Sequence, residues 1–452
     1  MKEKMNPDLL NDPINKLLVR LSLPVMLAGL LRTSYSFVDM LFASRLGGVQ
    51  VASVAFVAPL FIIFQALGLG LSNGGVSIIA KLLGENNEKK ASHYATQLRS
   101  LTLAITTLIC ILGLFISENI LAILGLEGDM LRESAVYTQI RFYSIPFAIF
   151  VQLYMAYYKA QGKMAITTKI ALMGVLGNTA LNALFLFVFN KGIEGLAYAT
   201  LITQAGQALY IYFRYQTEKH GFDLKWNFFS SKTDFKTWKE LLTVGLPLSF
   251  SQASVQFGFL LINTFIVSYG YQVVAAFAIG NQVNSLFFSP TTGISQAFVP
   301  LIAQNWGQKS GSRIKETIRR GVIFTLSVGT VGAVCIQFII RPLGTFLAKG
   351  DQVIITHTIH YVRLVGWTLI PWGLFTSLSG IFNGFQRTRM SMSINVIRLW
   401  GLRIPGLLLC SYVFTSLGEY GVWYTMFFSN VITALIAVVL YFIFVRNYVN
   451  EI

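Results

Sequence analysis

The sequence predicts an all-α membrane protein that crosses the bilayer twelve times in two similar six-helix bundles. The 452 residues are 54% hydrophobic and only 12% charged, whereas a soluble domain carries roughly 25% charged residues. Apolar runs long enough for a spanning helix of about 20 residues recur along the whole chain. The second half of the sequence also repeats features of the first. The short alternating segments that indicate barrel strands are not seen.

The apolar runs predict where each helix crosses the membrane. The first six spans are expected at 16–43, 52–80, 93–117, 135–158, 168–190 and 195–213. The second six are expected at 241–268, 273–303, 320–340, 355–380, 394–415 and 421–445. The longest polar stretch, 214–240, separates these two sets. We therefore expect an N-terminal bundle over 1–213, a cytoplasmic linker over 214–240 and a C-terminal bundle over 241–452.

The positive charge indicates which side of the membrane each loop faces. The chain has a formal net charge of +16, and most of its Lys and Arg residues fall at the two termini or in the even-numbered gaps between spans. Cytoplasmic loops are enriched in Lys and Arg, so both termini are predicted to be cytoplasmic, in a plasma or inner membrane. The polar segment 1–15 precedes an apolar run that is too long for a signal peptide, and an uncleaved cytoplasmic leader is expected. Because the basic residues lie between apolar runs, nucleic acid is not an expected partner.

The two halves resemble each other under a single shift of the sequence. The shift that superposes Pro24 on Pro247 also superposes Gly70 on Gly293 and other small residues, such as Ser72 on Ser295 and Ala80 on Ala303. We call it the repeat shift. Further along, a slightly longer shift superposes Pro146 on Pro371. Repeats with an even number of helices keep the same orientation, which predicts a pseudo-two-fold axis normal to the membrane and a cavity between the bundles, as in transporters.

Asp39 is the one acidic residue deep within any predicted span. A carboxylate at that depth is costly and is a functional candidate by default. The structural alternative is an ion pair with Arg32 or Arg45. Desolvation favours the protonated form of a carboxylate, so Asp39 is suited to load a proton from one side and release it on the other. The same oxygens suit Na⁺ if neutral oxygen ligands complete the site.

Several polar side chains are candidates to complete a site around Asp39. Tyr35 lies one turn before it in the first span. Asn178 and Asn182 lie one turn apart in the fifth span and therefore share one face, and Thr200 lies in the sixth. The alternative for the two asparagines is hydrogen bonding between neighbouring helices.

The second half offers cations in place of an acid. No acidic residue occurs within its six predicted spans, but Arg398 and Arg403 lie in the eleventh. They are candidates to meet an anionic part of a substrate, a lipid headgroup or backbone carbonyls. The alternative is that they extend to the membrane interface. Pro24, on the helix that carries Asp39, permits a bend and is the candidate hinge.

Other chemistries lack the residues that they need. The glycine-rich stretch 67–76 has no following Lys-Ser or Lys-Thr pair and no preceding strand, so it predicts close helix packing and no phosphate loop. No nucleophile–base pair and no zinc-ligand spacing is present. His357 and His360 have a spacing compatible with one metal, but no third ligand is evident. An enzyme and an ATP-driven pump are therefore disfavoured, and a channel would be expected to show rings of charge or a filter.

Motifs in both halves resemble those of one transporter family. They are LSLPVM at 21–26, VDMLFASRLG at 38–47, GNTALNALFLF at 177–187, GLAYATLITQ at 195–204, GLPLSF at 245–250 and RLWGLRIP at 398–405. Together and in this order, they resemble the multidrug and toxic compound extrusion (MATE) family, nearer its DinF-like branch. The resemblance covers essentially the whole chain and implies the MATE/MOP-type fold.

The resemblance also implies a function and residue roles. Family members are antiporters that expel organic cations and amphipathic drugs in exchange for H⁺ or Na⁺ by alternating access. The family's helix-one acid falls on Asp39 and its bending proline on Pro24. Its polar network falls on Tyr35, Asn178 and Thr200, and a helix-four tyrosine corresponds to Tyr137.

One departure from the family pattern bears on the coupling ion. Many relatives carry a second acid on helix five, where this chain has Asn182, so the proton is the better candidate than Na⁺. We expect no cofactor beyond the coupling ion, small amphipathic or cationic substrates, contact with membrane lipid and a monomeric protein. The alternative within the same superfamily is a flippase for lipid-linked sugars or another amphipathic anionic metabolite, for which Arg398 and Arg403 would suit an anionic headgroup.

Overall fold

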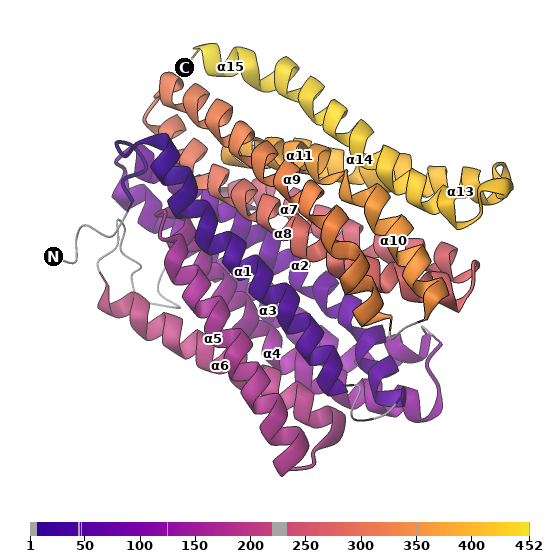
Figure 1. Cartoon of the computed structure of the whole chain (residues 1–452). Coiled ribbons are helices and arrows are strands. Elements are labelled where there is room, and N and C mark those ends of the chain that lie inside the picture. Colours follow the sequence, from indigo (N-terminus) through magenta and orange to yellow (C-terminus); the bar gives the residue numbers. More distant parts are fainter. Residues whose placement is uncertain are drawn as a thin grey trace. The chain divides into compact units, whose positions relative to one another are not determined.

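The computed structural model describes residues 7–43, 46, 48–123, 125–218, 233–348 and 351–451, and Figure 1 traces them in chain order. Within these ranges the regular structure is entirely helical, without strands. The all-α prediction is confirmed. The predicted linker, 214–240, includes residues 219–232, which lie outside the described part.

Six crossings make up the first half of the chain. They are α1 (Ile14–Ala43), α2 (Gly48–Gly84), α3 (Glu88–Ile123), α4 (Gly128–Ala160), α5 (Met164–Ala183) with the π-helical turn η2 (Leu184–Val188), and α6 (Gly192–Thr217). Each corresponds to one predicted span, and all but the fifth contain it completely; the predicted span 168–190 extends two residues beyond Val188. Most are longer than predicted because the helical hydrogen bonding continues past the apolar run into polar residues, as at Glu88.

The second half also makes six crossings, three of them interrupted. The continuous helices are α7 (Phe235–Val267), α8 (Tyr271–Gly307) and α9 (Gly311–Leu347). The tenth crossing is divided into α10 (Gln352–Gly366) and α11 (Leu369–Gly384), with a bend of 49° between them. The eleventh joins α12 (Thr388–Val396), the π-helix η3 (Ile397–Arg403) and α13 (Ile404–Tyr412). After the short turn η4 (Thr415–Leu417), the twelfth joins α14 (Glu419–Tyr441), the π-helix η5 (Phe442–Arg446) and α15 (Asn447–Glu451).

Length and composition identify most of these crossings as membrane spans. In the described ranges, nine helical stretches are long and apolar enough to cross a bilayer, and the bent α10 and α11 pair makes ten. The other two crossings, α4 and α6, carry more polar residues, including Arg141 within α4. Their place between spanning helices completes the twelve predicted crossings.

The helix bounds confirm the internal repeat. The repeat shift carries both ends of α2, Gly48 and Gly84, onto the two ends of α8, Tyr271 and Gly307. In the loops that follow these helices, the same shift places Asn86 on Lys309. Both residues adopt the left-handed conformation, with φ of 55° and 56°. Non-glycine residues adopt that conformation only rarely, so two at matching positions are not coincidental.

The predicted match of Pro146 with Pro371 needs a correction. The ends of α4 correspond to those of the pair α10 and α11, so that Gly128 matches Gln352 and Ala160 matches Gly384. This correspondence places Pro146 on Ile370, the residue before Pro371. Both ends of the crossing match at one shift, so the interruption adds no residue and the two prolines stand one residue apart in this correspondence.

Packing divides the chain into two compact units. Leu31–Phe250 forms one, called here the N-terminal unit, and Met1–Leu30 with Ser251–Ile452 forms the other, the C-terminal unit. α1 and α7 therefore each contribute residues to both units. The N-terminal unit has a core around Phe61, Phe142 and Tyr137. The predicted division of the sequence at 214–240 stays a prediction.

Candidate functional site

Three of the predicted polar residues form one hydrogen-bonded set in the N-terminal unit. The Asn182 side-chain amide donates to Asn178 Oδ1 at 2.7 Å, and the Asn178 amide donates to Thr200 Oγ1 at 3.1 Å. The Thr200 hydroxyl donates in turn to the Leu196 carbonyl at 3.0 Å. All three polar side chains are buried, being between 1% and 6% exposed. We call Asn178, Asn182 and Thr200 the amide cluster.

The local helical geometry explains why these groups meet. Asn178 and Asn182 are one turn apart near the end of α5, so their side chains lie on the same face. Thr200 lies in the third turn of α6, and its hydroxyl keeps a bond to its own helix while it accepts from Asn178. The cluster is neutral and joins α5 to α6, which is also what the helix-packing alternative predicts.

Tyr137 of α4 is buried in the apolar core of the same unit. Its ring lies 6.4 Å from that of Phe61 in an edge-on arrangement, and the guanidinium carbon of Arg141 lies 6.0 Å from its centre. The same guanidinium carbon is 5.0 Å from the centre of the Phe61 ring. A cation over two aromatic faces is stabilised by the ring quadrupoles. Arg141 was not among the predicted site residues, although an arginine in mid-span is a signal that could have found it.

For Tyr35 and Asp39, the two predicted site residues of the first span, the structure describes only the backbone. Tyr35 and Asp39 belong to α1 and to the N-terminal unit. Their side chains lie outside the described part of the structure. The predicted contacts of Asp39 with the amide cluster, Tyr35 or a nearby arginine therefore stay predictions.

The C-terminal unit buries its two arginines in different surroundings. Arg403 is 3% exposed and is held by hydrogen bonds to its neighbours on α14. Its Nε donates to Ser429 Oγ at 3.1 Å and its Nη2 to Asn430 Oδ1 at 2.8 Å. The Asn430 amide donates to Thr368 Oγ1 at 3.1 Å, so this network also reaches the break between α10 and α11.

Arg398 is equally buried, but no hydrogen bond like those of the Arg403 guanidinium is found for it within the described residues. It is 4% exposed, and its Nε makes no hydrogen bond within the described residues. Its guanidinium carbon lies 4.7 Å from the centre of the Trp372 ring and 5.6 Å from that of Phe375. No carboxylate of the described residues forms an ion pair with Arg398 or Arg403. Both side chains are therefore enclosed by protein atoms, and the predicted alternatives for their role stay predictions.

The arginines lie in the π-helix η3, a feature that the sequence did not reveal. π-helical segments are rare and occur often at functional sites. The aromatic residues beside Arg398 were also missed. Trp372 directly follows Pro371, which had been singled out only for the repeat.

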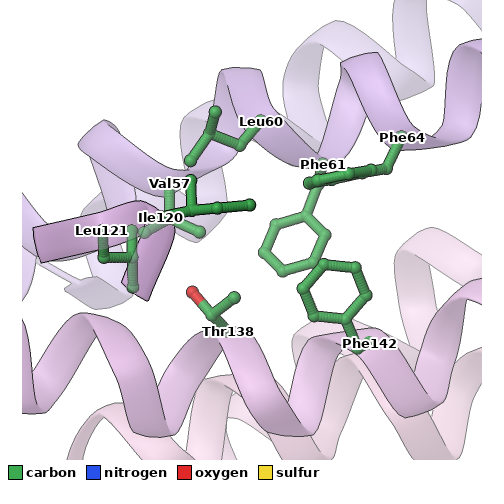
Figure 2. A pocket seen from close by; sticks show the side chains of 8 residues that line it. All are labelled: Val57, Leu60, Phe61, Phe64, Ile120, Leu121, Thr138 and Phe142. Atoms are coloured by element: carbon green, nitrogen blue, oxygen red, sulfur yellow. The ribbon is translucent and has the colours of Figure 1, made fainter. Parts of the chain in front are cut away.

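A small cavity in the N-terminal unit lies among α2, α3 and α4, and Figure 2 shows the side chains that line it. Seven of these are apolar, and the eighth is Thr138, whose buried hydroxyl has no hydrogen-bond partner among the described residues. The cavity has a volume of about 10 Å³, which is close to the minimum that holds one water molecule. It is too small to be a substrate site.

Metal-ligand geometry is not seen in the described ranges. No group of three or more His, Cys, Asp or Glu side chains lies close enough there to hold a metal ion. Since the Asp39 side chain is not described, this finding does not bear on the predicted Na⁺ option at that residue.

Comparison with known proteins now identifies the family. The sequence model of the MatE family matches residues 24–184 and 247–409, which cover most of both halves. The chain belongs to the MatE family. Members of this family are transporters, so the chain is a multi-span membrane transporter and not an enzyme. The DinF-like branch stays a prediction.

Curated relatives and solved structures agree with this assignment. The chain is 26% identical over 408 residues to the probable multidrug resistance protein YoeA of Bacillus subtilis (strain 168), covering 88% of this chain and 87% of that protein. It is 24% identical over 437 residues to the multidrug export protein MepA of Staphylococcus aureus (strain NCTC 8325 / PS 47), with 96% and 94% covered. One solved structure, described as the outward-facing conformation of a multidrug resistance MATE family transporter of the MOP superfamily, superposes with a TM-score of 0.92 at 21% identity, over 100% of this chain and 99% of that one. The predicted MATE/MOP-type fold is confirmed.

Proposed function

We propose that this MatE-family transporter is a secondary active antiporter that exports organic cations and amphipathic drugs in exchange for protons. The observation that carries the proposal is the buried amide cluster in the unit that also contains Asp39. The curated relatives named above are multidrug resistance and export proteins, which supports the substrate class.

The amide cluster suits a carboxylate that must change its charge. Asn178, Asn182 and Thr200 are uncharged, so they can donate hydrogen bonds to an ionised Asp39 without fixing its charge as an arginine would. A desolvated carboxylate favours its protonated form, and access of water or of a cationic substrate favours the ionised form. Proton binding and substrate binding would thus compete at one acid, which is the requirement for antiport.

Asn182 favours the proton over Na⁺ as the coupling ion. Sodium needs several oxygen ligands with enough negative charge to replace its hydration shell. One carboxylate with neutral amide and hydroxyl oxygens is a weak set for that purpose, whereas one carboxylate is sufficient to carry one proton. We therefore propose H⁺ as the coupling ion at Asp39, with Tyr35 and Tyr137 as supporting groups.

Pro24 is the proposed hinge of the transport cycle. It lies inside α1, where proline removes one backbone hydrogen bond, and α1 passes from one unit to the other between Leu30 and Leu31. Movement of one unit relative to the other would bend α1 and α7, the two helices that contribute residues to both units. Replacement of Pro24 by Ala should slow gradient-driven export and leave substrate binding intact; unchanged export and coupling in Pro24→Ala would remove the hinge from the mechanism.

The two arginines are proposed to have different roles. Arg403, whose guanidinium bonds Ser429 and Asn430, ties η3 to α14. Arg398 has aromatic faces beside it, and we propose that its positive charge binds an anionic part of an amphipathic substrate. We also propose that the protein acts as a monomer in the plasma or inner membrane with both termini cytoplasmic, as the distribution of Lys and Arg favours.

The experiment that tests the proposed function is transport of a lipophilic fluorescent cation in proteoliposomes. The purified protein should move the cation when a pH gradient is imposed, and a protonophore should abolish that movement. An imposed Na⁺ gradient of the same size should have little effect. Movement that ignores both gradients would refute antiport, and movement driven by Na⁺ alone would refute the choice of ion.

A further inference from the structure

A basic groove runs along the C-terminal unit between the start of α1 and the first half of α9. It has a volume of about 780 Å³, and its lining residues are Asn15, Lys315, Glu316, Arg319, Arg320, Ile323, Phe324 and Ser327. This volume is within the range of ligand sites, about 300–1,000 Å³. The transport mechanism uses none of these residues.

The helices that form the groove are held together at its base. Arg313 at the start of α9 donates to the backbone carbonyl of Asp12 at 2.9 Å, just before α1 begins. Further along, the α9 backbone at Gly321 faces Leu18 of α1, whose side chain would lie 3.3 Å from a Cβ atom at that position. These contacts fix the two walls of the groove within one unit.

The polar end of the groove has an excess of positive charge. Arg320 pairs with Glu316 at 2.8 Å. Lys315 and Arg319 lie one turn apart on an exposed face of α9. Their side chains have no ion pair or hydrogen bond within the described residues. Two unpaired cations beside each other repel unless an anion lies between them, so this end is built for a negative group.

The other end of the groove is apolar. Ile323, one turn beyond Arg319, is 56% exposed, and Phe324 also lines the wall. On α1 the exposed face continues from Asn15 through Val19 and Leu23, which are 48% and 50% exposed. A cationic end that leads into an exposed apolar track matches a molecule with a charged head and a hydrocarbon tail.

The internal repeat shows that this arrangement is particular to the C-terminal unit. The repeat shift places Ser92, Thr96 and Gln97 of α3 where α9 has Lys315, Arg319 and Arg320. The corresponding α3 and α7 surface of the N-terminal unit is instead joined by polar pairs, such as His93 with Asp234 at 3.0 Å. The basic residues of α9 are therefore not a general requirement of this fold.

We propose that this groove binds an anionic phospholipid of the adjoining leaflet. The headgroup phosphate would lie between Lys315 and Arg319, with an acyl chain along Ile323, Val19 and Leu23. Basic pockets between transmembrane helices bind anionic headgroups in this way, each cation near the surface contributing measurably to lipid affinity.

Native mass spectrometry of the purified protein with added lipid tests the proposal. Wild-type protein should retain phosphatidylglycerol and not phosphatidylcholine of the same chain length. The double variant Lys315→Gln with Arg319→Gln should lose roughly tenfold or more in affinity for phosphatidylglycerol. The matched control, Lys89→Gln with Lys90→Gln at the start of α3, removes the same charge and should bind as wild type does.

Two further measurements distinguish binding of the whole lipid from binding of its phosphate group alone. Inorganic phosphate should not displace the lipid at equal concentration, and Ile323→Asn should weaken lipid binding while both arginines and Lys315 remain. Elution of each variant as a single peak in size-exclusion chromatography checks that it is folded. Equal loss of lipid in the α9 and α3 double variants would overturn the proposal, as would displacement by phosphate alone.

Discussion

Gly70 of α2 lies directly against the backbone of Ser249 in α7, just after Pro247. A Cβ atom at Gly70 would come within 2.6 Å of the Ser249 Cα atom. The same relationship recurs at the matching positions of the repeat, in the C-terminal unit. There, a Cβ atom at Gly293 would lie 2.9 Å from the backbone nitrogen of Met26, just after Pro24. Both crossings thus need glycine to bring the helices together beside a proline.

Alanine at either glycine should destabilise the protein because the new methyl group meets backbone atoms, which cannot move aside as a flexible side chain can. Gly70→Ala and Gly293→Ala should each cost about 1–3 kcal/mol, as overpacked core substitutions do. Thermal unfolding in detergent measures the loss. The control is Gly206→Ala, a helical glycine with no neighbour within 4 Å of an added Cβ. Unchanged melting of both variants would show that these crossings tolerate wider spacing.

The sequence was sufficient to predict the twelve crossings and the repeat for a physical reason. Spanning helices must be apolar over about 20 residues, so hydropathy locates all of them except the more polar α4 and α6, which are placed by their position between spanning helices. The helix bounds of α2 and α8 follow the predicted shift. The breaks were not predictable in this way. The bend after Gly366 lies one turn before Pro371, which cannot donate a hydrogen bond to the carbonyl of Trp367, so this proline is a local signal for the bend. The π-helix at Arg398 depends on which backbone groups find partners in neighbouring helices, and no local pattern in the sequence records that.

The site was predictable in part. The spacing of Asn178 and Asn182 indicated a shared face, and the structure adds their bond to each other and to Thr200. The aromatic contacts of Arg398 and Arg141 were missed because they join residues distant in sequence, which one chain without relatives does not reveal.

Replacing Asn182 by Asp should introduce a response to sodium. In wild type the Asn182 amide donates to Asn178 Oδ1 at 2.7 Å, so an aspartate would place two oxygens against each other. A bound cation relieves that repulsion and gains a second carboxylate ligand. Sodium chloride should therefore raise the melting temperature of Asn182→Asp more than potassium chloride does, and wild type and Asn182→Leu should show no such difference. An Asn182→Asp variant indifferent to the cation would argue against a cation site at the amide cluster.

Arg403 and Arg398 should respond differently to substitution. Arg403→Gln removes the donors to Ser429 and Asn430 and should cost about 1–3 kcal/mol of stability, because buried acceptors are left unsatisfied. Arg398→Gln leaves no such acceptor unsatisfied and loses an aromatic contact worth about 2 kcal/mol at a desolvated site. It should instead reduce export of a zwitterionic amphiphile roughly tenfold or more, while export of the matched cation is kept.

Thermal unfolding of the two arginine variants, together with transport of the matched pair of amphiphiles, checks both expectations. Arg403→Lys is the informative control, since it keeps the charge and loses the forked donor geometry. Equal export of the zwitterion and the cation by Arg398→Gln would contradict the proposed role of Arg398.

Asp234 should make stability depend on acid pH. Its carboxylate accepts hydrogen bonds from the Thr237 hydroxyl at 2.6 Å, from His93 and from the Lys236 backbone at the start of α7. The bond from Thr237, followed by that from His93, holds the pKa of Asp234 below its usual 3.8. Because the folded state lowers this pKa, the carboxylate stabilises the fold above about 3.8 and loses that effect as the pH falls through the lowered value.

Asp234→Asn should therefore melt at a lower temperature than wild type at pH 7, and the two melting temperatures should converge as the pH falls below the usual pKa. A melting curve for each protein across this pH range makes the comparison. A constant difference at all pH values would mean that the ionised state of Asp234 is not what stabilises the start of α7.

The most direct test of the account compares wild type with Asp39→Asn in proteoliposomes under an imposed pH gradient. Both proteins should bind a lipophilic fluorescent cation, but only wild type should accumulate it against its concentration gradient, because asparagine has the shape of the acid and no exchangeable charge. The variant should let the cation equilibrate across the membrane without responding to the pH gradient. Equal gradient-driven accumulation by both proteins would contradict the claim that Asp39 couples proton movement to export.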